Sequence, residues 1–218
     1  MHPVPMSKTN FRVLTLFESL GLTGYIAWFI WRLQTTHPFS WLVFPVWLLA
    51  SIAIHRDTPK TLGWRIDNLW PATRQGLLIY AVLILGTFST GLLSGAFHRP
   101  PPRVTEPWRF FAYAAFCLLQ QIALNSYLTN RLLYALESPR LTAFLAGGIF
   151  AALHWPNPVL VPLTFIGGVA MSWLFSRERN IFPLTAGQAI LGTLAWWVFP
   201  VAWHHGMRVG PGFYAFHQ

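Results

Sequence analysis

Charge is what this sequence has least of: only 10% of its 218 residues are Asp, Glu, Lys or Arg, and just six are acidic. Soluble domains carry about 25% charged residues, so this deficit excludes most water-soluble folds. The 54% hydrophobic content excludes a disordered chain. A single cysteine, Cys117, excludes an internal disulfide.

Long apolar runs take the place of charge. Because roughly 20 apolar residues cross a bilayer as a helix, they predict an all-α, polytopic transmembrane helical bundle in a single domain, residues 1–218. Seven spans are expected, at about 11–31, 39–54, 76–97, 108–133, 141–154, 159–175 and 181–201. An eighth short element near the C-terminus is the alternative. Residues 203–218, with several aromatic side chains after a Gly-Pro-Gly turn, are predicted to form a docking tail.

Basic residues lie between the apolar runs and give a net charge of +9. Anionic lipid accounts for this position better than nucleic acid does, so the expected partners are the lipid bilayer and other integral membrane proteins, and no nucleic acid. Ten Lys and Arg lie on the N-terminal side of the predicted spans and five on the opposite side. This difference predicts a cytoplasmic N-terminus. The membrane expected for this integral protein is the bacterial inner (cytoplasmic) membrane.

Polar side chains inside the spans are the informative positions, because lipid offers them no partner. Glu18 is the one acid well inside a predicted span, and the polar N-terminus nearby favours a hydrated place at the interface over contact with a partner helix. Gln121 and Asn125, four residues apart, share one helical face. With His154 and Gln188 on later spans, they either bind one another to hold the bundle together or line a polar chamber.

Two further patterns concern packing and metals. Gly167 and Gly168 are adjacent small residues that permit close helix contact. His204 and His205 are adjacent too, but neighbours on a helix point in different directions, so a solvent-facing or headgroup-facing pair is favoured over a metal site. No metal and no other cofactor are predicted.

Three short patterns follow one another in order. They are Gln120-Gln121-Ile-Ala-Leu-Asn125, then Phe150-Ala-Ala-Leu-His154 with Pro156-Asn157 behind it, and Gln188-Ala-Ile-Leu-Gly192. In order and spacing the chain, over about 59–192, resembles the CPBP family of intramembrane proteases, which includes the CAAX prenyl endopeptidases and bacteriocin-processing proteins. That family shows Glu-Glu-x-x-x-Arg, Phe-x-x-x-His and His-x-x-x-Asn motifs. The resemblance implies a CPBP-like bundle with Gln120, Gln121, Asn125, His154, Asn157 and Gln188 at or beside its active-site positions.

The departures from these motifs concern chemistry. In the family, the motif glutamate is thought to activate the hydrolytic water with help from histidines. A glutamine has no basic carboxylate, and a positioned general base contributes about 10²–10⁴ in rate. Of the motif residues only Phe150 and His154 remain, and one histidine without carboxylates makes a poor metal site.

The sequence therefore predicts a catalytically inactive CPBP-like protein, a pseudoprotease acting as a subunit or scaffold that packs against other membrane proteins or lipid-like ligands. The sequence leaves open whether the protein is an enzyme and favours the interpretation that it is not. One alternative is an active intramembrane peptidase with an atypical site around His154. The other is a small transporter or binder of an amphipathic molecule, although the sequence shows no internal repeat of the kind common in transporters.

Overall fold

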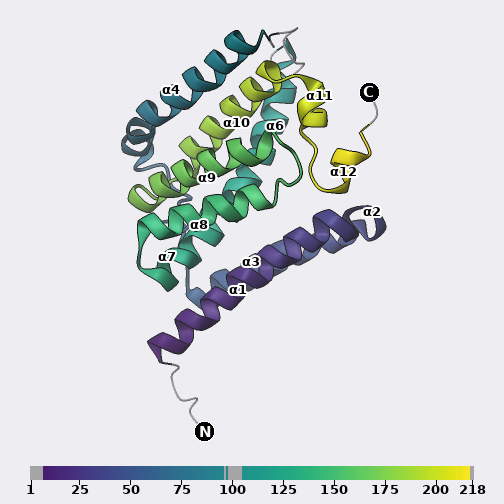
Figure 1. Cartoon of the computed structure of the whole chain (residues 1–218). Coiled ribbons are helices and arrows are strands. Elements are labelled where there is room, and N and C mark those ends of the chain that lie inside the picture. The colour runs from purple at the N-terminus through teal and green to yellow at the C-terminus, as the bar shows by residue number, and fades with distance from the viewer. Residues whose placement is uncertain (1–6, 96, 98–104, 217–218) are drawn as a thin grey trace.

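A computed structural model describes residues 7–95, 97 and 105–216, and these residues form helices and connecting turns with no strand among them (Figure 1). Within this part of the chain, five helices are long and apolar enough to cross a membrane. They are Lys8–Thr36, Pro38–His55, Leu69–Ser94, Leu160–Arg177 and Ile181–Val198. The predicted polytopic helical bundle is thereby confirmed.

The remaining predicted spans are also helical. The span at 108–133 lies on a continuous run of α6 (Pro107–Gln121), the π-helix η3 (Ile122–Thr129) and α7 (Asn130–Leu136). The span at 141–154 lies on the shorter apolar helix α8 (Pro139–Ala152). The chain ends in three short turns of helix, α11 (Val201–His204), η4 (His205–Met207) and α12 (Pro211–Tyr214).

The first two long helices form a hairpin beside the rest of the bundle (Figure 1). It comprises α1 (Lys8–Trp28), η1 (Phe29–Leu33), α2 (Gln34–Thr36), η2 (Pro38–Leu42) and α3 (Val43–His55), and α1 packs on α7. The other helices, α4 (Leu69–Ser94), α6, α8, α9 (Leu160–Arg177) and α10 (Ile181–Val198), lie together as the core.

Charged side chains join the hairpin to the core, which shows that the expected hydrated position of Glu18 is wrong. The Glu18 side chain is only 14% exposed, its Oε2 lies 2.9 Å from Nε2 of His55, and its Oε1 lies 3.6 Å from Nε of Arg131. Nη2 of Arg131 donates to Oδ2 of Asp57 at 2.6 Å. We call Glu18, His55, Asp57 and Arg131 the ion cluster. These charged side chains can be buried because they pair with one another. Glu18 therefore faces partner helices, which is the interpretation that the sequence disfavoured.

The turn between the hairpin and α4 is fixed against the core by hydrogen bonds through a side chain of η3. The Nε1–H of Trp64 donates to Oγ of Ser126, which itself donates to the carbonyl of Leu62. Beyond the spans, the hydrogen bond from Arg65 lowers the pKa of the Asp67 carboxyl below its ordinary value. The bonds through Ser126 hold the turn at residues 62–64 against η3, which carries part of the site.

The backbones of helices α8 and α9 approach each other closely at Gly147 and Gly168. A Cβ added to Gly168 would lie 2.9 Å from Cα of Gly147, whereas a Cβ added to Gly167 would meet nothing closer than 3.8 Å. Small residues let two helices approach in this way. The close approach thus depends on Gly168 of the predicted pair, together with Gly147, which the sequence did not single out.

Replacing Gly168 with alanine is expected to destabilise the protein by about 1–3 kcal/mol, because the added methyl group meets backbone that cannot move without separating α8 from α9. The neighbouring Gly167→Ala is the matched control. It has room for its methyl group and gains helix propensity, so it should unfold no earlier than the wild type. Thermal unfolding in one detergent compares the two, and equal losses would contradict this account of the packing.

Candidate functional site

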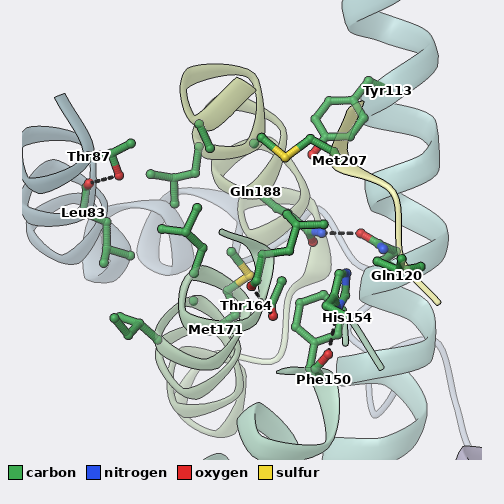
Figure 2. Close-up of a pocket in the computed structure, with 18 of the residues that line it drawn as sticks. Leu83, Thr87, Tyr113, Gln120, Phe150, His154, Thr164, Met171, Gln188 and Met207 are labelled. Carbon is green, nitrogen blue, oxygen red and sulfur yellow. Dashed lines mark hydrogen bonds between the residues drawn. The ribbon is translucent and has the colours of Figure 1, made fainter. Parts of the chain in front are cut away.

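Four side-chain amides form a hydrogen-bonded row between α6, η3 and α10. Asn125 Nδ2 donates to Gln121 Oε1 at 2.5 Å, and Gln121 Nε2 donates to Gln188 Oε1 at 2.6 Å. Gln188 Nε2 in turn donates to Gln120 Oε1 at 2.5 Å (Figure 2). We call these four residues the amide network. Every donation runs in the same direction, from Asn125 toward Gln120.

The local helix geometry brings two of these amides inside. Gln121 ends α6, and Asn125 lies in the π-helix η3 that follows without a break. Both side chains are fully buried, and Gln121 Nε2 also lies 3.0 Å from Sδ of Met171 on α9. π-helical turns inside α-helices are frequent at functional sites, and this one turns the polar face of the segment toward α9 and α10.

His154 follows the last turn of α8 and is held by its own helix. Its Nδ1 lies 2.6 Å from the carbonyl oxygen of Phe150, and the two rings meet edge to face with centroids 4.6 Å apart. Because a carbonyl only accepts, Nδ1 carries the proton, and Nε2 of the neutral ring keeps a lone pair. His154 therefore presents a hydrogen-bond acceptor.

Gln120, Gln188 and His154 line one chamber of about 280 Å³ enclosed by α4, α6, α8, α9, α10 and the C-terminal segment, which we define as Val201–Phe216 (Figure 2). Most of its wall is aliphatic or aromatic. The polar groups of the sequence prediction that reach this space are thus an imidazole and two amides, while Gln121 and Asn125 stand behind them.

Tyr113 and Met207 also line the chamber, and sequence reasoning missed both. A Cβ at Gly192 would lie 1.9 Å from the Tyr113 hydroxyl oxygen, so this hydroxyl occupies the space that a side chain at 192 would need. Tyr113 precedes Gln120 by seven residues, two helical turns, and this spacing could have placed it on the same face. No sequence pattern around Met207 indicates that this residue lines the chamber.

Asn157 lies apart from the amide network. Its Nδ2 donates to the carbonyls of His204 and Arg208, at 2.8 and 3.0 Å, and its Oδ1 accepts from the backbone N–H groups of Val159 and Leu160. This single side chain therefore caps the start of α9 and ties down the C-terminal segment.

The C-terminal segment closes one end of the chamber. Gly206, Met207 and Val209 contribute to the chamber wall, and the Gly210 N–H donates to the carbonyl of Trp155 at 2.9 Å. The His205 ring stacks on Phe213 with centroids 4.0 Å apart. The described part of the predicted docking tail thus contacts this chain itself, and residues 217 and 218 lie outside the described residues.

Replacing Asn157 with alanine should lower stability by about 2–4 kcal/mol, since it removes a helix cap and the donor to the carbonyls of His204 and Arg208. Asn157→Asp is the matched comparison, because it keeps the acceptor for the cap and replaces the donor with a carboxylate oxygen that the two carbonyls repel. The rate of amide hydrogen exchange in residues 201–216 measures how firmly Asn157 holds the C-terminal segment. Unchanged exchange in both variants would contradict the tethering role.

Metal ligands do not gather in the described part of the chain: it contains no group of three or more His, Cys, Asp or Glu placed to hold an ion. The chamber offers one imidazole and neutral amides, which do not fit a catalytic zinc site with three protein ligands. We therefore derive no step through a metal.

Comparison with known proteins gives one match. Residues 107–194 match the family model described as type II CAAX prenyl endopeptidase, Rce1-like. No curated protein and no solved structure matches the chain. The matched segment runs from α6 into α10, so it contains the whole amide network and His154, while α1 to α4 and the C-terminal segment lie outside it. The resemblance predicted from the sequence motifs is confirmed for this segment.

Proposed function

We propose that this membrane protein, whose residues 107–194 match the Rce1-like CAAX prenyl endopeptidase family model, holds a lipid-like ligand in its chamber and does not hydrolyse peptides. The observation that carries the proposal is the amide network. Where the resemblance to the family motifs expects two glutamates, an arginine and a histidine, four neutral side chains bind one another.

Hydrolysis requires a group that takes a proton from water. Amides do not do so at neutral pH, and the carbonyl oxygens of Gln120, Gln121 and Gln188 already accept hydrogen bonds from their neighbours. The ion cluster holds carboxylates, but it joins α1, α3 and α7 and contributes nothing to the chamber wall. This arrangement stabilises the bundle without providing a glutamate base.

Binding needs only a shaped apolar space with a few polar groups, and the chamber has both. Its volume of about 280 Å³ is close to the lower end of small-molecule pockets, which measure roughly 300–1,000 Å³. Ile166 of the chamber wall is 51% exposed on the outside of α9. A ligand can therefore extend from the chamber toward lipid.

Native mass spectrometry of the protein released from a mild detergent tests the proposal. The wild type should retain one small apolar molecule, and Leu163→Trp, which fills the chamber from α9, should lose it. Leu145→Trp is the matched control, because Leu145 lies on α8 outside the chamber wall and is 38% exposed. Equal occupancy in the wild type and Leu163→Trp, or no bound molecule in any protein, would contradict the proposal.

A subunit or scaffold role is part of the same proposal. Its support is the number of tryptophans exposed on the outside, among them Trp28, Trp70 and Trp203, since such side chains are enriched at interfaces with proteins and with lipid head groups. Purification in mild detergent tests this role: an integral membrane partner should accompany the chain in a fixed ratio. A chain that always elutes alone as a monomer would contradict it.

An atypical peptidase is the second candidate, and one observation favours it. Nε2 of His154 has a lone pair and lies in the chamber wall, so it can accept a proton from a water molecule placed there. This candidate predicts slow cleavage of prenylated or leader peptides that His154→Ala abolishes and Gln121→Leu leaves in place.

A further inference from the structure

We infer that the ligand of the chamber is an uncharged amphipathic molecule whose head group both donates and accepts a hydrogen bond, as a long-chain primary amide or alcohol does. The inference rests on the proposed function and specifies the ligand class for the same chamber. Its starting point is two polar side chains of the chamber wall, Gln120 and His154, whose remaining hydrogen-bonding capacities are opposite.

The direction of the amide network decides what Gln120 offers. Gln120 is the last member, and its Oε1 accepts from Gln188, so its Nε2 group is the part left to donate. His154 offers the opposite capacity, because its Nδ1 is engaged with the carbonyl of Phe150 and its Nε2 accepts. One donor and one acceptor at the same chamber therefore match a head group that has both (Figure 2).

The chamber wall also excludes a charged head group. Among the described residues, none of those that line the chamber is Asp, Glu, Lys or Arg. An ion placed in an apolar site without a counter-charge costs several kcal/mol, whereas a neutral group that makes both hydrogen bonds does not pay this penalty. The charged residues of the ion cluster are engaged with one another on α1, α3 and α7.

The apolar tail of the ligand is expected to lie on the apolar side of the chamber. Leu83 and Thr87 of α4 lie across the chamber from Gln120 and His154 (Figure 2). An apolar cavity of about 150 Å³ holds a benzene molecule, so about 280 Å³ accommodates a head group and roughly the first eight carbons of a chain. A longer chain reaches lipid beside Ile166, which is both chamber wall and outer surface.

Three probes with the same twelve-carbon tail test the head-group preference: dodecanamide, dodecylammonium and dodecanesulfonate. Each competes with a diazirine-bearing dodecanamide for photolabelling of the full chain in nanodiscs, and labelled peptides are mapped by mass spectrometry. We expect labelling of residues that line the chamber, and displacement by dodecanamide at concentrations at least tenfold below those of the two charged probes.

Two variants examine the residues behind the preference. Gln120→Leu should weaken dodecanamide about tenfold, and Gln120→Glu should reverse the order so that dodecylammonium displaces the label best. Gln34→Leu, an exposed amide on α2 away from the chamber, is the control and should match the wild type. Chamber labelling with no preference among the three probes, or with no reversal in Gln120→Glu, overturns this inference and leaves the proposed function standing. Absence of any label in the chamber overturns both.

Discussion

Replacing Arg131 with methionine should destabilise the protein by about 3–5 kcal/mol, because the arginine is the cation between two carboxylates at a buried position. Its side chain is 3% exposed, and it also donates from Nε and Nη2 to Oγ of Ser51. Methionine fills similar space, so the expected loss comes from Asp57 left without its cation and from Glu18 left with His55 alone. Thermal unfolding in detergent, followed by circular dichroism, measures it.

Two comparisons separate this effect from a general loss of charge. Arg12→Met removes an ion pair with Glu137 whose side chains are 36% and 64% exposed, so it should cost no more than about 1 kcal/mol. Adding Asp57→Asn to Arg131→Met removes the carboxylate that lost its cation and should restore part of the stability. If Arg131→Met and Arg12→Met destabilise equally, the ion cluster does not hold the hairpin to the core.

Restoring a glutamate at position 121 should also have a large effect. The Gln121 side chain is fully buried among Asn125, Gln188 and Met171, and within the described part of the chain it binds no cation. Gln121→Glu therefore buries an unpaired carboxylate and should cost about 3–5 kcal/mol at pH 8. The loss should shrink as the pH falls, because the protonated carboxyl is neutral and donates a hydrogen bond.

The double variant Gln121→Glu/Asn125→Arg supplies the missing cation four residues away on the same face. It should recover at least half of the stability lost by Gln121→Glu, since these two side chains already touch at 2.5 Å. The control is Gln120→Glu, whose side chain reaches the chamber and is less buried, so it should cost less. Stability that is unchanged in Gln121→Glu would show that the network does not require neutrality.

The helices could be predicted from the sequence because apolar runs are local. Each predicted span overlaps a helix, although residue 96 of the predicted span 76–97 lies outside the described residues, and the i, i+4 spacing of Gln121 and Asn125 correctly implied a shared face. The partners of a polar side chain are not local. Glu18 meets His55, 37 residues away, and Arg131, much further along the chain, and no spacing rule connects them.

Details of the site were beyond the sequence for the same reason. Asn157 follows the Phe150–His154 pattern directly, yet its donors go to the C-terminal segment, about fifty residues later. The close packing of Gly168 on Gly147 depends on how α8 and α9 cross, which composition does not determine. The role of Met207 in closing the chamber likewise depends on the path of the chain after α10.

The central claim, that the chamber binds and does not cut, is tested most directly by incubating the purified protein with a farnesylated CAAX peptide in water enriched in oxygen-18. Mass spectrometry detects any new carboxyl group through the heavy oxygen that hydrolysis adds. The account predicts an intact peptide at stoichiometric protein concentration, in the wild type and in His154→Ala alike. An oxygen-18-labelled product that forms with the wild type and disappears with His154→Ala would contradict it.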